Sequence, residues 1–409
     1  MALLGEIYLG GSENSPESRS FFNSSVGFKL KSPSKISEKK SFDNGNWEVE
    51  VQRGHRYIVA RSKSVLLVDQ ILSIGFDHCQ TFLDCVSISK KREMQIEGAG
   101  TEYILLFNNK NNFILREVSL TEIVIDTEVK ITVTDKNGNI VPQPPQLEPV
   151  WTPAFRYYRL SQSSQDLFEA YRNLFLGFEF MLHQICPKNK GEREIDWLYR
   201  TLSTINKKIP LSNYAPKGVQ DPMQYLIDEQ YKGIRVKLFH AKGNDFILPF
   251  ENLNPQKVAD AYEALISLWR EIASVYFNIP REGGVVTHCG FKHIMDKLYC
   301  QGVTFCATVD ASPFNGKDTC ISPLNLPVYP FTETKYLSES KPGNVQLYGA
   351  MDAETLNQIT QIHRIGVYVD KKLISVDLIT DGLTLTGIDS FERYETIRLI
   401  NEGTPKIIF

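Results

Sequence analysis

The sequence lacks any apolar stretch long enough to cross a membrane. Among its 409 residues there is no run of about 18 uncharged apolar residues, which a spanning helix needs. The first residues have neither a basic start nor a sustained apolar segment, so no signal peptide is expected. We therefore expect a cytoplasmic protein that does not contact a membrane.

Several motifs of familiar enzymes are also missing. There is no Gly-x4-Gly-Lys-Ser/Thr loop, no Gly-x-Gly-x2-Gly after a strand, no Gly-x-Ser-x-Gly elbow and no His-Glu-x2-His. These absences argue against nucleotide hydrolysis, dinucleotide redox chemistry and zinc-protease chemistry of the usual kinds. We expect no cofactor.

Cysteine is scarce, and positive charge is not in excess. The seven cysteines are odd in number and loosely spaced, which favours reduced thiols. The segment 288–306 contains histidines and cysteines, but it lacks the Cys-x2-Cys pairs of structural zinc sites, so no metal site is expected and zinc is a weaker alternative. The net charge of −3 argues against a general nucleic-acid coat, although a local basic groove is compatible with it.

What is present predicts a multidomain α+β protein. The length suggests about three domains. Residues 1–140 have short alternating and apolar runs such as 47–51 and 103–107, and an Asn-Gly turn signal follows at 135–139. They predict an N-terminal mostly-β domain. A proline-rich linker at 141–151 marks its end.

Apolar residues then recur every three or four positions, which predicts a helical bundle over 152–280. Its expected helices cover 164–185, 192–209, a segment from Asp221 to about Gly243, and one that begins at Asn254. Strand patterns return beyond 280, with a turn at 370–372 and one helix from Asp352 to His363. Residues 285–409 are therefore expected to form a C-terminal α+β domain.

One pair of residues in the bundle is suited to cleaving RNA. Arg235 can brace a phosphate with its planar, permanently charged fork, and His240 can transfer a proton near neutral pH. A helix C-terminus favours the protonated imidazole, which suits a general acid. Five residues of α-helix separate the two side chains by about 140° around the axis. The long arginine stem, an unwound last turn, or a second copy of the chain would be needed to bring them together.

The bundle resembles the HEPN superfamily, whose nuclease members have an Arg-x4–6-His motif on a late helix. The likeness rests on Arg235 to His240, on the helix entry Phe155-Arg-Tyr-Tyr-Arg-Leu-Ser-Gln-Ser-Ser164 with 167–180, and on Gly191-Glu-Arg-Glu-Ile-Asp-Trp-Leu198. It implies a homodimer in which two Arg235/His240 pairs line one cleft without a metal. Val236 departs from the family pattern, because a polar residue usually follows the arginine.

The helix at 164–185 has a polar face opposite its apolar stripe. Glu169, Arg172, Leu176, Glu179 and His183 are spaced by three or four residues along it, four of these five are polar, and Asn173 lies next to them. One interpretation is a solvated face with charge pairs. The other is that Glu179, Arg172, Asn173 and His183 line the cleft beside His240.

Two functions follow from these observations. The first is a metal-independent HEPN-type endoribonuclease that acts in bacterial antiviral defence or as a regulated toxin, with RNA as substrate and a protein partner or inhibitor controlling it. The second is a non-catalytic HEPN-like scaffold or sensor that dimerises and binds a protein, nucleic-acid or nucleotide partner. Arg235 and His240 favour the first, whereas Val236 and the acidic pI favour the second.

Overall fold

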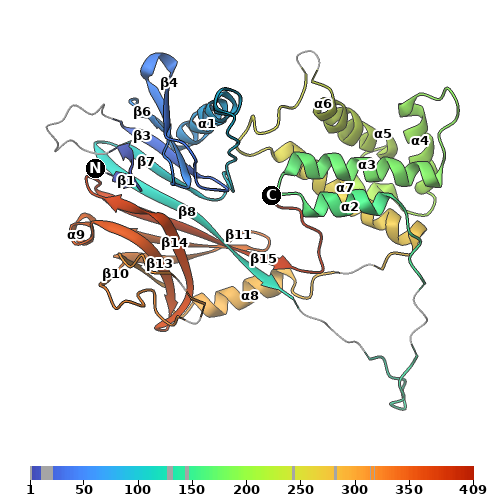
Figure 1. Cartoon of the computed structure of the whole chain (residues 1–409). Helices are drawn as coiled ribbons and strands as arrows, with labels where there is room; N and C mark the ends of the chain where they lie inside the picture. Colours follow the sequence, from blue (N-terminus) through green and yellow to red (C-terminus); the bar gives the residue numbers. More distant parts are fainter. Residues whose placement is uncertain are drawn as a thin grey trace. The chain divides into compact units, whose positions relative to one another are not determined.

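The chain is a multidomain α+β protein with two compact units (Figure 1). The computed structural model describes residues 2–10, 22–126, 132–142, 147–241, 245–280, 283–313, 315–316 and 318–409. Strands dominate the unit formed by Met1–Val124 and Val286–Ile400, and helices dominate the unit formed by Ile125–Val285 and Asn401–Phe409. Within the described residues no helix is both long and apolar enough to cross a membrane.

The described strands of the first unit form two sheets. The six-stranded sheet contains, in spatial order, β10 (Val328–Pro330), β9 (Thr304–Thr308), β13 (Gln361–Val369), β14 (Lys372–Leu385), β1 (Ala2–Leu4) and β2 (Ile7–Gly10). The nine-stranded sheet contains β11 (Glu333–Lys341), β12 (Asn344–Met351), β15 (Ser390–Asn401), β8 (Asn112–Ile125), β7 (Tyr103–Asn109), β3 (Ser24–Lys29), β6 (Tyr57–Ser62), β5 (Trp47–Val51) and β4 (Glu38–Phe42).

Both sheets combine strands from the two ends of the chain, which corrects the predicted separation of 1–140 from 285–409. Strand β1 pairs with β14, with Ala2 opposite Leu385, and β8 lies beside β15. An ion pair of 2.7 Å between Arg116 and Glu392 also joins the two segments. Hydrophobic alternation marks a strand in the sequence, but it does not reveal a partner almost 300 positions away.

The sheet unit also contains helices that the strand-like patterns did not predict. They are α1 (Val68–Lys90) and α8 (His288–Tyr299), with the 3₁₀ turn η1 (Asp43–Gly45). The short α9 (Ala353–Leu356) lies where a helix was predicted. Helix α1 buries Phe76 and Phe82 and packs on β3, β5 and β6. Its buried residues, among them Ile71, Cys79 and Val86, recur at helical spacing between strand-like patterns on either side.

The predicted helix from Asp352 to His363 is shorter than expected. Asp352 caps it as predicted, accepting a hydrogen bond from the Thr355 amide at 2.9 Å, but the helix ends at Leu356. The chain then enters β13 at Gln361, because the following apolar residues complete a sheet. The predicted turn at 370–372 is confirmed, since Asp370 and Lys371 have positive φ between β13 and β14.

A charged cluster lies buried in the sheet unit. Arg393 of β15 donates to Glu117 of β8 at 2.6 Å, to Asp377 of β14 at 3.0 Å and to Glu395 at 3.2 Å. Because Asp377 belongs to the other sheet, the guanidinium ties the two sheets together. Burial raises the pKa of Glu117 to about 7; Arg393 opposes this shift, and the nearby Asp377 and Glu395 carboxylates add to it.

The Glu117 shift predicts that the sheet unit loses stability as pH rises from 6 to 8. A carboxyl group whose pKa is raised on folding stabilises the fold below its ordinary pKa of 4.5 and loses that contribution as pH passes about 7. The free energy of unfolding should fall by at most about 1.4 kcal/mol per pH unit. Urea unfolding at pH 6, 7 and 8 measures this, and Glu117→Gln should flatten the curve. A slope that the variant leaves unchanged would contradict the assignment.

The second unit is a helical bundle. Its elements are α2 (Ala154–Ser163), α3 (Leu167–Ile185), α4 (Glu194–Ile205), η2 (Leu211–Tyr214), α5 (Pro222–Leu226), the π-helix η3 (Ile227–Arg235), α6 (Val236–Phe239) and α7 (Gln256–Phe277). The predicted stripe of α3 is buried, from Leu167 through Tyr171 to Leu182. The predicted cap of α5 is also present, with Asp221 accepting from the Gln224 amide at 3.0 Å.

The C-terminal residues belong to this bundle, which the sequence did not predict. Phe409 packs edge-on against Tyr262 of α7, with ring centroids 5.2 Å apart. The Lys406 amide donates to the Gln162 side chain at 2.7 Å. Residues 401–409 therefore complete the helical unit, although the preceding strand β15 belongs to the sheet unit.

Parts of two predicted boundaries and one predicted strand lie outside the described residues. These are 143–146 of the proline-rich linker, residues 281–282, and 129–131 of the alternating run at 129–134, which is typical of a strand. Nearby, the predicted Asn-Gly turn is confirmed: the Gly138 amide donates to the Asp135 carbonyl at 3.0 Å, and Thr134 bridges to Ile140.

Candidate functional site

The helix that carries Arg235 is wound as a π-helix rather than as the expected continuous α-helix. Its backbone hydrogen bonds span five residues, as in the bond from the Val236 amide to the Tyr231 carbonyl. Gly233 permits this winding, because a Cβ there would lie 2.9 Å from the Asp228 carbonyl oxygen. Such turns are rare and often occur at functional sites.

Gly233→Ala should therefore destabilise the helical unit. In an ordinary helix the change would add up to about 1 kcal/mol of stability, whereas here the added methyl group meets a backbone carbonyl. We expect the free energy of unfolding to fall by about 1–3 kcal/mol, as in overpacked sites. Urea unfolding measures the change. Glu229→Ala, at an exposed position of the same helix, is the control, and a stabilised Gly233→Ala protein would contradict the steric argument.

Arg235 is held in a half-buried position by aromatic rings and a carboxylate. Its guanidinium lies over the rings of Tyr231 and Phe239, with centroid distances of 5.4 and 5.0 Å. Its Nη2 atom lies 3.4 Å from Glu179 Oε1 on α3. Its Nε is buried, and no described residue accepts a hydrogen bond from it. The guanidinium is thus fixed in place, and its Nη atoms, rather than the buried Nε, are the donors for an acceptor such as a phosphate oxygen.

His240 lies next to Arg235. The helix ends at Phe239, and His240 has extended dihedral angles (φ −128°, ψ 94°). This unwound end places His240 Nε2 3.5 Å from Arg235 Nη1, although a continuous α-helix would separate the two side chains. Because the guanidinium only donates hydrogen bonds, His240 Nε2 is the acceptor if the contact is a hydrogen bond. The contact therefore suits a base, whereas the sequence favoured an acid. Gly243, the expected helix end, lies outside the described residues.

Glu179 is the third member of the group, as one interpretation of the polar face of α3 proposed. Burial raises the pKa of Glu179, and the charge of Arg235 acts in the opposite direction. Neither carboxylate oxygen accepts a hydrogen bond from a described residue. Glu179 therefore balances the charge of Arg235 through its buried Oε1.

The other residues predicted to line the cleft take different roles. Arg172 donates to the Leu238 carbonyl at 3.1 Å and to Glu169 at 2.6 Å, so it fastens the end of α6 to α3. Asn173 donates to the Glu169 carbonyl at 3.0 Å, four residues back on its own helix. The structure thus brings Arg235, His240 and Glu179 together. Arg172 contacts Leu238, two residues before His240, and Asn173 is not part of the group.

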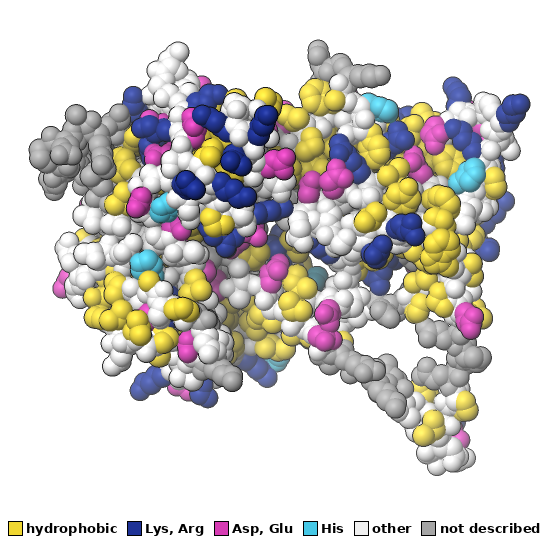
Figure 2. All heavy atoms as spheres, in the orientation of Figure 1, with side chains coloured by type: hydrophobic (Ala, Val, Ile, Leu, Met, Phe, Trp, Pro, Cys, Tyr) yellow, Lys and Arg dark blue, Asp and Glu magenta, His cyan; other side chains and the backbone are white. Residues whose placement is uncertain are grey.

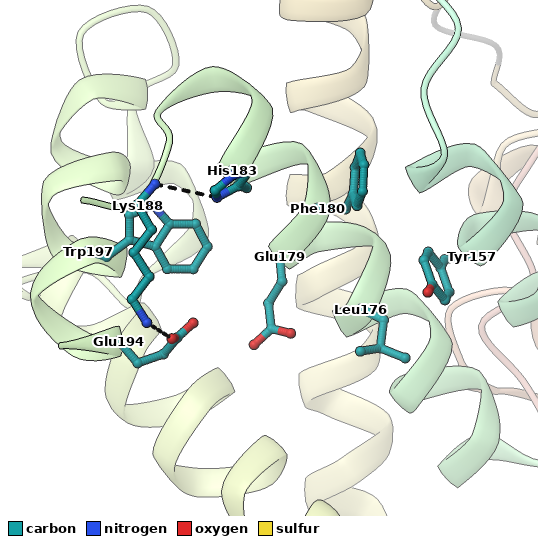
Figure 3. A pocket seen from close by; sticks show the side chains of 8 residues that line it. All are labelled: Tyr157, Leu176, Glu179, Phe180, His183, Lys188, Glu194 and Trp197. Atoms are coloured by element: carbon teal, nitrogen blue, oxygen red, sulfur yellow. Dashed lines mark hydrogen bonds and ion pairs between the residues drawn. The ribbon is translucent and has the colours of Figure 1, made fainter. Parts of the chain in front are cut away.

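An open pocket of about 320 Å³ lies on the other side of Glu179. Figure 3 shows the Glu179 carboxylate between Trp197 on one side and Leu176 and Tyr157 on the other. Its apolar lining consists of Tyr157, Leu176, Phe180 and Trp197, and its polar lining consists of Glu179, His183, Lys188 and Glu194. His183 accepts from the Lys188 amide at 3.4 Å, so this residue lines the pocket and is not among the contacts of His240.

Sequence reasoning missed the aromatic residues of the site. Tyr231 and Phe239 lie four positions before and after Arg235, a spacing that brings helical side chains onto one face and could have revealed the pair. Tyr157 gave no such signal, because it faces the pocket from α2, a helix that was not predicted.

The face shown in Figure 2 has side chains of both charges, and the cysteines form no disulfides. On the face shown in Figure 2, basic and acidic side chains are interspersed, and no broad basic field covers it. All seven cysteines are free. In the described part of the chain, no three His, Cys, Asp or Glu side chains gather where they could hold a metal ion, and this includes the histidines and cysteines of 288–306.

Comparison with protein-family models, with curated proteins and with solved structures finds no match.

Proposed function

We propose that the protein is a metal-independent endoribonuclease and that its helical unit is of HEPN type. The observation that supports this most directly is the 3.5 Å approach of Arg235 Nη1 to His240 Nε2 at an interrupted helix. A fixed cation beside an imidazole is the minimal pair for cleavage of a phosphodiester next to a 2′-hydroxyl group.

The chemistry needs one base, one acid and a cationic brace. Unprotonated His240 Nε2 removes the proton of the 2′-hydroxyl, and the 2′-oxygen attacks phosphorus. Arg235 stabilises the extra negative charge on the phosphoryl oxygens. The bond to the 5′-oxygen breaks, and that oxygen receives a proton from an acid. The products are a 2′,3′-cyclic phosphate and a 5′-hydroxyl group.

A homodimer would supply the acid. A second copy brings a second His240, which in its protonated form serves as the proton donor. The segment just beyond the motif supports such an association, because Phe246, Leu248 and Phe250 expose 40%, 52% and 42% of their surface. Exposed apolar side chains grouped in this way mark interaction surfaces. Sedimentation equilibrium tests for the dimer.

The same proposal includes a biological role for the ribonuclease and a task for the sheet unit. A ribonuclease of this type acts in the cytoplasm, in bacterial antiviral defence or as a regulated toxin. The sheet unit, which includes the predicted N-terminal β segment and the C-terminal α+β segment, recruits a protein partner or inhibitor that controls cleavage.

Two observations favour a second function, a non-catalytic HEPN-like scaffold or sensor. The position after Arg235 is the apolar Val236, and the carboxylate of Glu179 already lies beside the guanidinium. In that case the bundle dimerises and binds a protein, nucleic-acid or nucleotide partner, and Arg235 serves to hold η3 against α3.

Cleavage of RNA by the purified full chain in EDTA distinguishes the two functions. The nuclease predicts fragmentation that is lost in both Arg235→Ala and His240→Ala. Arg193→Ala, at an arginine with 83% of its side chain exposed, is the matched control and should retain activity. An intact RNA with the wild-type dimer, also in the presence of its partner, would support the scaffold.

A further inference from the structure

We propose that a basic patch on the sheet unit binds the phosphate backbone of RNA. The basic patch consists of the exposed side chains of Lys31, Lys35, Lys40, Lys91 and Arg92. The choice of RNA rests on the proposed ribonuclease function, because the patch would hold the substrate by phosphates other than the one that is cleaved. The patch belongs to the sheet unit, whereas the catalytic pair belongs to the helical unit.

Two segments that are distant in the sequence bring these side chains together. One connects β3 to β4, and the other is the end of α1 with the chain that follows it. The Lys31 amide donates to the Gln95 carbonyl at 2.9 Å, and Lys90 Nζ lies 3.3 Å from a carboxylate oxygen of Glu38. The basic residues of the two segments are therefore neighbours in space. Figure 2 shows basic side chains grouped over β4 and α1, on a face where both charges are otherwise interspersed.

Positive charge is concentrated here in a chain whose net charge is −3. Residues 29–40 contain five lysines and one glutamate. Three basic side chains next to the patch have carboxylate partners, and they are Lys39, Arg56 and Lys90. Among the described residues, no carboxylate forms an ion pair with any side chain of the basic patch. Like charges held close together repel one another, so the patch is suited to a ligand that carries several negative charges.

The surroundings of the patch favour contacts with phosphates rather than with bases. Phe42 follows Lys40 on the same face of β4, and its ring centroid lies 5.2 Å from Lys40 Nζ. The ring is also stacked on His78, with centroids 4.8 Å apart. Because Phe42 is already engaged in this way, it is not a stacking platform for an unpaired base. Phosphate contacts carry no sequence information, so we expect binding that depends on salt and not on base sequence.

An anionic membrane is the other large polyanion that a basic surface can meet. Surfaces that lie on lipid combine basic residues with a face of exposed apolar side chains. Of the large apolar side chains described in residues 29–40 and 86–97, only that of Ile88 is exposed, by 84%. The patch therefore has the charge that both ligands need but lacks the apolar face that lipid requires, which favours RNA.

Fluorescence anisotropy of the full chain with a labelled 2′-O-methyl RNA oligonucleotide tests the patch. The proposed chemistry cannot cut this probe, because it has no free 2′-hydroxyl group. The patch variant combines Lys35→Gln, Lys40→Gln, Lys91→Gln and Arg92→Gln. At about 50 mM salt it should bind the probe about tenfold or more weakly than the wild type. The slope of log affinity against log salt should become shallower by about 2–3, since each phosphate contact with a single strand contributes about 0.7.

The matched control removes the same amount of charge from exposed lysines in the C-terminal segment of the sheet unit. It combines Lys297→Gln, Lys341→Gln, Lys371→Gln and Lys372→Gln. The control should bind the probe within about twofold of the wild type, because only the charges that touch phosphates release counterions on binding.

The outcomes separate the basic patch from the nuclease. Loss of probe binding in the patch variant alone would support the patch, even in a protein that cuts no RNA. Arg235→Ala should weaken probe binding less than the patch variant does, since it removes one cation rather than four. Equal weakening by the patch variant and the control would overturn the patch, because net charge alone would then explain binding. So would unaltered probe binding in the patch variant, even if RNA is cleaved, or binding to phosphatidylserine–phosphatidylcholine vesicles without binding to the probe.

Discussion

His240→Ala is expected to lower the rate of RNA cleavage by roughly 10²–10⁴-fold, the usual contribution of a positioned acid–base group. The imidazole is held where the helix ends, and its Nε2 faces the guanidinium 3.5 Å away. Alanine removes the proton acceptor without disturbing the bundle core, because the His240 side chain is exposed. Initial rates with a fluorescent RNA oligonucleotide in EDTA measure the effect.

Two further variants complete this experiment. Arg235→Lys keeps the charge but loses the planar fork that stacks between Tyr231 and Phe239, so it should recover little activity. His293→Ala, at an exposed histidine of the sheet unit, should cleave at the wild-type rate. A His240→Ala protein with full activity would remove the imidazole from the mechanism.

Arg393→Met is expected to produce the largest loss of stability, about 3–5 kcal/mol, because it leaves buried carboxylates without their cation. Arg393 is 1% exposed, as is Glu395, and Glu117 is 6% exposed. The loss should be smaller at pH 6 than at pH 8, since Glu117 can take up a proton at the lower pH. Urea-dependent hydrogen exchange of peptides from β8 and β15 measures the stability of this unit separately from that of the bundle.

The matched control for this variant is Arg193→Met, where the arginine pairs with Asp196 on the surface of α4. Exposed ion pairs contribute at most about 1 kcal/mol, so the control should unfold almost like the wild type. Equal effects of the two substitutions would show that Arg393 does not hold the two sheets together.

The sequence predicted local structure in the bundle well, because a single periodic stripe encodes it. Leu174 and Phe178 lie on the buried face of α3 as their spacing indicated, and Asp221 caps α5. The same reasoning found individual strands of the sheet unit, such as β5 at Trp47–Val51, but not how they pair. The pairing of β8 with β15 depends on residues about 276 positions apart, such as Glu117 and Arg393, and no local pattern contains that information.

The candidate site was predictable in part. Arg235, His240 and Glu179 were identified by residue type and spacing, and they lie together in the structure. Their meeting depends on the π-helix and on the unwound end at His240, which helical periodicity does not predict because it assumes 3.6 residues in every turn. Within this helix, Gly233 avoids the contact that a Cβ would make with the Asp228 carbonyl oxygen at 2.9 Å.

The most direct measurement is mass spectrometry of the fragment ends after the full chain has acted on RNA in EDTA. The account predicts 2′,3′-cyclic phosphates and 5′-hydroxyl groups from the wild-type protein, and uncut RNA from Arg235→Ala. Fragments ending in 3′-hydroxyl groups, or wild-type and Arg235→Ala proteins that give the same fragments, would contradict it.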